Sequence, residues 1–363
     1  EADRTSRVLG LFSRRRGFCN ASSEITILLR KGFSMSSSIR CGRLAIATLI
    51  AGCVLMLTSF LAQSADEDDV LTARNGIASI GKRWDGEVMA ATSALYIELQ
   101  RATGDRSGVE ATMDVSYGPH ELQTVDVFAP VERSDELAPV VVFVHGGGMV
   151  RGNKTIANTD LIYSNIPTFF ARHGIVGVNA NYRLVPEVQW PSGPEDIGGM
   201  LTWVRENIES YGGDSQKVFL MGNSAGGRHV ASYLFHEPSH FADGPGVIGA
   251  LLSSGSYRSG SSDALRSYYG EDAAVRAGLV PLGLVDSYDG PEIPIFMWSA
   301  EFDPTMIEAP VAVMYARLCA KYSDCPRYTQ FQGHNHVSHI MSINSADETV
   351  GPVLLEFVSS VIH

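Results

Sequence analysis

Residues 218–227 read VFLMGNSAGG, and this stretch decides the fold. The apolar run 218–221 predicts a buried strand, and the residues after Ser224 predict a helix over 225–235. Between them lies the pattern Gly-x-Ser-x-Gly, whose small residues two positions before and after the serine let strand and helix approach closely. Such a turn lifts the serine oxygen above the edge of the sheet. The stretch therefore predicts Ser224 as a nucleophile, the alternative being an ordinary glycine-rich turn.

Apolar runs and helical stretches alternate on both sides of this turn. Strands are predicted at 122–127, 139–144, 175–180, 218–221, 247–252, 293–298 and 328–332, and helices at 160–172, 195–209, 225–235, 309–320 and 346–361. This alternation predicts an α/β fold with a mostly parallel central sheet and helices on both faces. Two other segments, the amphipathic 65–110 and the Ser-, Gly- and Tyr-rich 255–290, are expected to form a small cap. Residues 65–363 are accordingly predicted to be a single catalytic domain.

A glycine-rich segment, His-Gly-Gly-Gly-Met at 145–149, directly follows the strand at 139–144. Glycines at this place let backbone N–H groups point into a cavity with no side chain in the way. Together with the N–H of Ala225, such donors would stabilise the oxyanion that develops during acyl transfer. A phosphate-binding loop is excluded because the chain has no Gly-x-x-x-x-Gly-Lys-[Ser/Thr] and the glycines at 146–148 do not form Gly-x-Gly-x-x-Gly, which leaves a plain glycine turn as the alternative.

An acidic residue follows the strand at 293–298. Asp303 is the preferred partner for a catalytic histidine because Pro304 marks an immediate turn after it, and Glu301 is the second choice. An acid in this position orients a histidine and stabilises its imidazolium form.

Three histidines, His334, His336 and His339, lie within seven residues after the last predicted strand. The base must reach Ser224 across the sheet edge, and the loop after the last strand is where this topology delivers it. We expect His336 to be the base, with His339 and then His334 as alternatives. The chain order Ser, Asp, His is that of the α/β-hydrolases.

With these motifs the chain resembles an α/β-hydrolase of the carboxylesterase type with an H-G-G-G oxyanion motif, near the hormone-sensitive-lipase-like and arylformamidase-like esterases. Residues 181–187, NYRLVPE, are similar to the N-Y-R-L-x-P-E segment of that group, and Trp190-Pro191 and Asp196 match the W-P…D that follows it. The resemblance covers 120–361.

Several roles are implied by this resemblance. The nucleophile, its acid partner and the oxyanion donors would be Ser224, Asp303, Gly147, Gly148 and Ala225, with a histidine as the base. Arg183 and Asp196 are expected to form internal hydrogen bonds that brace the oxyanion loop. The chain departs from the family at Asn223, where many relatives have Asp or Glu.

The expected activity is hydrolysis of carboxylic esters by a serine hydrolase through an acyl-enzyme intermediate, with no cofactor and no metal. Amidase, arylformamidase and lactonase activities use the same machinery and stay open. Two other classes compete with it: a metal-dependent hydrolase built on the spacing His334-x-His336-x-x-His339, and a non-catalytic binding protein of the same fold.

The amino-acid composition limits which partners the protein is expected to bind. The 363 residues carry a net charge of −12, so the surface repels phosphate backbones, and nucleic acid is not expected to bind. A small-molecule ester is the expected partner. The pocket walls are expected from Met149, Val150, Trp190 and Tyr257. Their apolar character favours acyl or aryl esters over charged ones.

The N-terminal region looks like a targeting segment. Leu44–Ala62 is uncharged, follows two arginines and precedes an acidic run, which is the pattern of a secretory signal. We expect translation to start at Met35, residues 1–34 to be upstream sequence read through in frame, and 35–64 to be a signal peptide. The alternatives are a membrane anchor and a lipoprotein signal that ends at Cys53. The catalytic part is expected outside the cytoplasm, in the periplasm or secreted.

Removal of that signal would leave two cysteines, Cys319 and Cys325. An even number of cysteines in an exported chain suggests a disulfide, with two free thiols as the alternative. No stable membrane contact is expected if the signal is cleaved, and the sequence predicts no oligomeric state.

Overall fold

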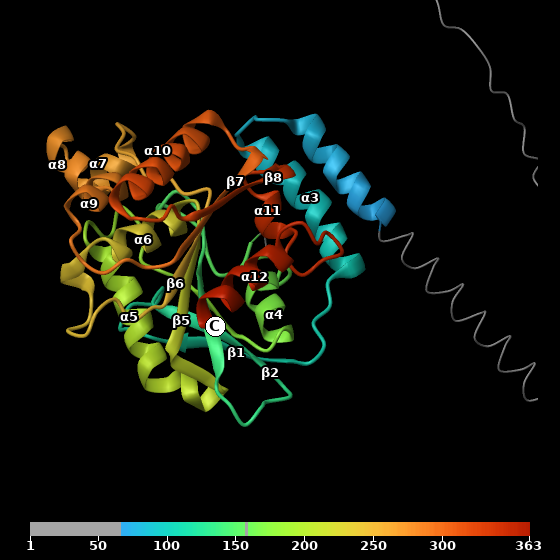
Figure 1. The fold of residues 1–363 in the computed structure, drawn as a ribbon. Coiled ribbons are helices and arrows are strands. Elements are labelled where there is room, and N and C mark those ends of the chain that lie inside the picture. Colours follow the sequence, from blue (N-terminus) through green and yellow to red (C-terminus); the bar gives the residue numbers. More distant parts are fainter. Residues whose placement is uncertain (1–66, 157–158) are drawn as a thin grey trace, which may run out of the picture. The chain divides into compact units, whose positions relative to one another are not determined.

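A computed structural model describes residues 67–156 and 159–363, and its centre is an eight-stranded sheet (Figure 1). The strands are β1 Val109–Ser116, β2 Thr124–Pro130, β3 Ala138–Val144, β4 Val176–Ala180, β5 Gly213–Asn223, β6 Gly249–Ser253, β7 Ile295–Phe302 and β8 Arg327–Asn335. Their order in the sheet is β1-β2-β4-β3-β5-β6-β7-β8. β2 runs antiparallel to both of its neighbours, and the pairs from β4 to β8 are parallel.

The central strand β3 shows why the sheet is covered on both faces. Its residues alternate between two apolar clusters: Val140 and Val142 pack on one face, Val141 and Phe143 on the other. The first cluster includes helices α5 Ser192–Asn207, α6 Ala225–Leu234, α9 Pro281–Ser287 and α10 Thr305–Lys321. The second includes α3 Gly86–Thr103, α4 Asn165–Arg172, α11 Ser338–Met341 and α12 Gly351–Ile362. A strand buried on both faces reads as a continuous apolar run, which is why β3 is evident in the sequence.

The two segments expected to form a cap are largely helical. The N-terminal one contains a helix over 67–80 and α3, with a turn between them. The later one contains α7 Asp263–Tyr269, α8 Ala273–Leu279 and α9, which lie together beside α10 (Figure 1).

The structure differs from the sequence expectation at β1, where no strand was predicted. Its sequence VEATMDVS alternates apolar and polar residues, which is a strand pattern, but all eight of its residues are exposed or only partly buried. β1 is an edge strand that pairs only with β2, so it needs little apolar surface. Two helices also begin later than predicted, α4 at Asn165 and α12 at Gly351, and the short α11 was not predicted.

Other expectations concern the termini and the cysteines. The predicted read-through segment 1–34 and the signal peptide 35–64 lie outside the described residues. Within the described part of the chain, no helix combines the length and the apolar character needed to cross a bilayer. Cys319, in the last turn of α10, and Cys325, just before β8, lie side by side, with Cα atoms 4.3 Å apart and sulfur atoms at bonding distance.

Candidate active site

The predicted catalytic side chains meet at one edge of the sheet. The glycine segment follows β3, Ser224 follows β5, Asp303 follows β7, and His336 follows β8. Because β3, β5, β7 and β8 are parallel, their carboxyl ends lie along the same edge, where open α/β sheets bind ligands. Residues separated by as many as 112 positions are thereby brought into contact.

Ser224 occupies a strained turn between β5 and α6. Its backbone angles are φ +55° and ψ −112°, outside the regions that a residue with a side chain ordinarily adopts. The turn is tight because Gly226 lies directly against the backbone of β3, where a Cβ atom would overlap the carbonyl oxygen of Val144. The small residues of the Gly-x-Ser-x-Gly pattern are therefore required by close packing, and the turn leaves the Ser224 side chain in the wall of a cavity.

A chain of two hydrogen bonds joins the three side chains. Ser224 Oγ lies 3.0 Å from His336 Nε2, and His336 Nδ1 lies 2.7 Å from Asp303 Oδ1. With the proton on Nδ1, the ring donates to the carboxylate, and Nε2 is free to accept the serine proton. This is the geometry of a nucleophile, a base and an orienting acid.

Asp303 is fully buried and held at both carboxylate oxygens. Oδ2 accepts the backbone N–H of Ala300 at 2.8 Å and the hydroxyl of Ser254 at 2.7 Å, while Oδ1 faces His336. Burial by itself raises the pKa of Asp303, but the hydrogen bond and charge of His336, together with the Ala300 N–H, outweigh it. The pKa stays below its usual value, so the carboxylate remains charged beside the imidazole.

The other two histidines of the loop have different partners. His339 Nδ1 donates to the carbonyl of Asn335 at 2.9 Å, and its Nε2 accepts the hydroxyl of Ser253 at 2.7 Å. Burial lowers the pKa of His339 to about 3. His334 lies near Ser338, with its Nδ1 3.1 Å from the Ser338 hydroxyl oxygen, and burial lowers its pKa as well. Both rings are neutral and embedded, whereas His336 borders the cavity.

The glycine segment provides free amide groups near Ser224. Gly147 and Gly148 have φ angles of +132° and +67°, and a Cβ atom at Gly147 would overlap the carbonyl oxygen of Arg151. Neither of these two amides donates a hydrogen bond to another described residue. Ala225 is the first residue of α6, so its N–H also lacks an intrahelical acceptor. The three donors predicted for the oxyanion thus border the same cavity as Ser224.

Polar and aromatic contacts hold the glycine segment from behind. The ring of His145 stacks on Tyr182 at 4.4 Å, and the Tyr182 hydroxyl donates to the His145 carbonyl. Further along, the buried Lys154 ammonium donates to the buried carboxylate of Asp126 and, at 2.6 Å, to Asp114. The segment is consequently anchored on both sides of its glycines.

Arg183 and Asp196 are joined to each other by internal hydrogen bonds. Asp196 is fully buried and accepts hydrogen bonds from the backbone N–H of Arg183 at 2.9 Å and from its Nε at 2.8 Å. Gln123 donates to the same carboxylate at 2.8 Å. Neither residue lines the cavity beside Ser224, so their contacts are internal.

The cavity beside Ser224 has a volume of about 1060 Å³. Both segments expected to cap the site contribute walls, among them Trp84 and Met89 before and within α3, and Leu265 in α7. Met149 and Val150 line it as predicted from the sequence.

The structure does not bring the other two predicted wall residues to this cavity. Trp190 packs its ring against Tyr268 and Tyr269, and Tyr257 is fully buried in the core under α6 and α9. The ring of Tyr257 lies against Gly255, just after β6, where a side chain would overlap it.

Four residues near the site were missed by sequence reasoning. They are Trp84, Lys154, Arg228 and Ser254. The ring of Trp84 meets that of His336 edge-on, with centroids 4.6 Å apart. Ser254 had a usable signal, since polar residues directly after a buried parallel strand lie at the ligand-binding edge. Arg228 lies one helical turn after the nucleophile, a position that also predicts proximity.

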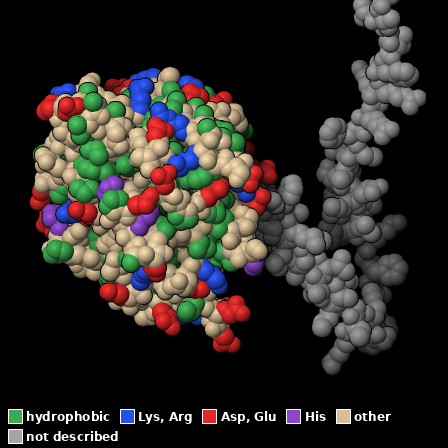
Figure 2. All heavy atoms as spheres, turned by 60° about the vertical axis from the view of Figure 1, so that its left-hand side comes forward, with side chains coloured by type: hydrophobic (Ala, Val, Ile, Leu, Met, Phe, Trp, Pro, Cys, Tyr) green, Lys and Arg blue, Asp and Glu red, His purple; other side chains and the backbone are tan. Residues whose placement is uncertain are grey.

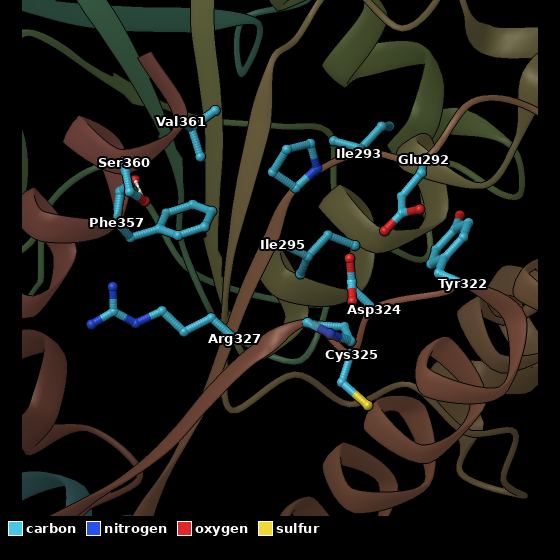
Figure 3. A pocket seen from close by; sticks show the side chains of 12 residues that line it. Glu292, Ile293, Ile295, Tyr322, Asp324, Cys325, Arg327, Phe357, Ser360 and Val361 are labelled. Atoms are coloured by element: carbon cyan, nitrogen blue, oxygen red, sulfur yellow. Dashed lines mark hydrogen bonds between the residues drawn. The ribbon is translucent and has the colours of Figure 1, made fainter. Parts of the chain in front are cut away.

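A second, smaller hollow lies at the opposite end of the sheet. Its volume is about 420 Å³, and it is lined by the beginnings of β7 and β8 and by the end of α12 (Figure 3). Glu292, Asp324 and Arg327 lie around it without the hydrogen-bonded order seen at Ser224. Within residues 67–156 and 159–363, no group of three or more His, Cys, Asp or Glu is arranged to hold a metal ion.

Solved esterases share this architecture. Esterase B from Lactobacillus rhamnosis superposes with a TM-score of 0.60 at 19% identity, over 77% of this chain and 96% of that one. A thermostable esterase from Pseudomonas putida superposes with a TM-score of 0.55 at 19% identity, over 75% and 88% of the two chains. The chain has the α/β-hydrolase fold. At such identities the likeness establishes the fold alone.

Sequence comparison adds a shorter region of similarity. Residues 125–237 match the family described as BD-FAE. Esterase LipC from Mycobacterium tuberculosis is 30% identical over 133 residues, which are 36% of this chain and 32% of LipC. Arylacetamide deacetylase from Oryctolagus cuniculus is 34% identical over 119 residues, 31% of this chain and 29% of that protein. The chain therefore spans about a third of the length of the curated relatives it matches.

Proposed function

We propose that the protein is a serine hydrolase that cleaves carboxylic esters through an acyl-enzyme intermediate. The observation that carries the proposal is the hydrogen-bonded chain from Ser224 Oγ through His336 to Asp303, at 3.0 and 2.7 Å, in the wall of a large cavity. The similarity to proteins named esterase and carboxylesterase supports the same reaction class.

In the proposed reaction, Ser224 Oγ attacks the ester carbonyl carbon while His336 Nε2 takes its proton. The carbonyl oxygen becomes an oxyanion that accepts hydrogen bonds from the N–H groups of Gly147, Gly148 and Ala225. The protonated His336 then gives its proton to the departing alcohol, and the acyl group stays on Ser224. Water, deprotonated by the same histidine, attacks the acyl-enzyme and releases the acid.

Asp303 acts in this scheme without taking up a proton. Its carboxylate keeps the His336 proton on Nδ1 and stabilises the imidazolium that forms twice per turnover. The two donors on Oδ2, from Ala300 and Ser254, hold the carboxylate in place for this role.

Covalent labelling tests the assignment of the nucleophile. A fluorophosphonate probe should attach to Ser224 in the wild type, located by peptide mass spectrometry, and should not attach in Ser224→Ala, which should also lose ester hydrolysis. Ser262→Ala removes another hydroxyl from the cavity wall and should still label, because Ser262 has no histidine partner among the described residues. Unlabelled wild-type protein, or turnover retained in Ser224→Ala, would overturn the proposal.

The kind of acyl compound needs a second measurement. We propose esters ahead of amides, formamides and lactones, and a panel that contains a nitrophenyl ester series, an arylformamide and a lactone ranks them by kcat/KM. A higher kcat/KM for the arylformamide or the lactone than for every ester would place the activity in that class instead.

We also propose that the catalytic domain is exported and that Cys319 and Cys325 form a disulfide. The uncharged stretch Leu44–Ala62 supports export, and the adjacent sulfur atoms support the disulfide. N-terminal sequencing of the protein isolated from a cell fraction outside the cytoplasm should begin near residue 65. Alkylation before and after reduction should differ by two labelled thiols. An uncleaved cytoplasmic protein would contradict the first proposal, and alkylation without reduction the second.

A further inference from the structure

The cavity beside Ser224 contains a buried positive charge that the proposed reaction does not use. Arg228 lies in the first turns of α6 and lines the cavity, yet only 2% of its surface is exposed. Buried guanidinium groups normally pair with a carboxylate, because burying an unpaired charge is costly. Among the described residues, no Asp or Glu oxygen lies within ion-pair distance of Arg228.

The neutral partners of Arg228 leave part of its donor capacity unused. Nη2 donates to the Ser256 hydroxyl and to the Arg258 carbonyl, both at 3.0 Å, so both of its hydrogens are engaged. Nη1 has one contact, to the Tyr269 hydroxyl at 3.5 Å, at the limit of hydrogen bonding. Since Nη1 carries two hydrogens, at least one N–H has no acceptor among the described residues.

The remaining charges around the cavity do not neutralise this group. The acidic residue of the lining is Asp85, whose carboxylate caps α3 by accepting the Val88 N–H at 2.8 Å and contacts Arg83 at 3.1 Å. The protein as a whole is acidic, and acidic side chains are scattered over the face seen in Figure 2. A second cation of the lining, Arg151, is exposed to solvent. The buried cation at Arg228 is therefore a local property of the cavity and does not follow from the general charge of the surface.

Burial alone does not mark a ligand site. Arg276 is also buried, donates to the carbonyl of Gly270, and has no carboxylate partner among the described residues, but it does not line the cavity. Arg228 differs because it lies in the same cavity wall as Ser224, from which it is separated by one turn of α6.

We propose that Arg228 is a specificity-determining residue that binds an anionic group of the substrate, so that this hydrolase prefers esters whose acyl or alcohol part carries a carboxylate. This inference rests on the proposed ester hydrolysis at Ser224. A carboxylate that enters the cavity supplies the missing counter-charge and accepts the unused Nη1 hydrogen, an arrangement that arginine favours. This proposal differs from the expectation of uncharged substrates, which was drawn from apolar wall residues.

Matched ester pairs test the inference. The mono-nitrophenyl ester of glutaric acid is compared with an uncharged nitrophenyl ester of the same size that ends in an isopropyl group. A second pair places the carboxylate or the isopropyl group on the alcohol. In the wild type, kcat/KM for the charged member of at least one pair should exceed that of its uncharged partner.

Two arginine variants locate the preference. Arg228→Gln should reduce the charged-to-uncharged ratio of kcat/KM by about tenfold to a hundredfold, the effect of losing one hydrogen bond to a charged group. Arg228→Lys should restore part of the ratio, and Arg276→Gln, which removes the buried arginine outside the cavity, should leave the ratio at the wild-type value.

The outcomes separate this inference from the proposed function. If the wild type hydrolyses uncharged esters but shows no preference for the charged member of either pair, the inference is overturned and the proposed function stands. An unchanged ratio in folded Arg228→Gln, with fluorophosphonate labelling retained, also overturns it. If no ester of either kind is hydrolysed, the proposed function itself fails. Should Arg228→Gln not fold, the ratios of the wild type and of Arg228→Lys decide.

Discussion

The two walls of the cavity are built differently. The wall at the sheet edge is formed by the glycine segment, Ser224 and His336. These residues directly follow parallel strands, and hydrogen bonds through Asp303 fix the two side chains. The wall formed by residues 84–89 and 262–265 comes from the beginnings of α3 and α7 and the turns before them, and several of its side chains are exposed. This difference in construction indicates different roles. The wall at the sheet edge fixes the geometry of the reaction, and the other wall selects the substrate.

Kinetics of variants in each wall test this difference. Substitutions at the sheet edge should lower kcat for every ester by similar factors, because they change the shared chemistry. Substitutions in the opposite wall should change the ranking of esters more than the rate of the best one.

The largest expected effect separates two histidines of one loop. His336→Ala should lower kcat by a factor of about 10⁴ to 10⁶, since it removes the base. His339→Gln should lower kcat by less than about tenfold, but should destabilise the fold by about 1–3 kcal/mol because Ser253 loses its buried acceptor. Steady-state kinetics and denaturant unfolding measure the two effects. A large loss of kcat in His339→Gln with activity retained in His336→Ala would reverse the assignment.

The acid of the site should show the next largest effect. Asp303→Asn should lower kcat by about 10⁴-fold, because the amide no longer holds the proton on His336 Nδ1. Glu301→Gln is the matched control: Glu301 accepts the backbone N–H of Gly333 at 2.7 Å and does not contact His336. Its kcat should stay within about threefold of the wild type, since an amide oxygen can still accept that N–H. A larger loss in Glu301→Gln than in Asp303→Asn would make Glu301 the acid.

Loss of the Lys154 contact behind the glycine segment should lower kcat less than loss of Asp303, and it should do so for every substrate. Lys154→Met leaves the carboxylate of Asp126 buried without its partner, which should destabilise the protein by about 3–5 kcal/mol. We expect kcat to fall by about tenfold to a hundredfold, because displacement of the segment removes oxyanion donors. The double variant Lys154→Met/Asp126→Leu removes the unpaired charge and should regain most of the stability. If kcat is unchanged in folded Lys154→Met, the glycine segment does not depend on this anchor.

The opposite wall should give the smallest and most substrate-dependent effect. Trp84 is 38% exposed and meets His336 only through ring edges, so Trp84→Ala should change thermal stability little. Its kcat/KM should fall severalfold for bulky esters and less for acetates, since the lost surface is apolar contact. If kcat/KM in Trp84→Ala fell for every ester as far as it does in Asp303→Asn, Trp84 would be needed to position the reacting groups.

Much of the fold and the site can be predicted from sequence because parallel strands are buried on both faces. Their apolar runs stand out, and the residues that follow them must lie at one edge. Ser224 and Asp303 are predictable for that reason, helped by the glycine spacing and by Pro304. β1 is missed although VEATMDVS alternates apolar and polar residues, because the helical pattern assigned to 65–110 runs into its first residues.

The cavity walls are much harder to predict. Whether Trp190 or Arg228 faces the substrate depends on how α6 and the segment after β6 pack, and no local periodicity encodes that packing. The sequence prediction took apolar residues as pocket walls. It therefore included Tyr257, which is buried in the core, and omitted Arg228, which lines the cavity.

The backbone at Ser224 has a consequence for the whole molecule. A residue held at φ +55° and ψ −112° raises the free energy of the folded state by about 1–3 kcal/mol, and glycine at the same place would relieve most of it. The inactive Ser224→Gly protein should therefore melt at a higher temperature than the active one. The most stable sequence at this position therefore differs from the most active one. The natural sequence keeps the serine that the reaction needs and has the lower stability.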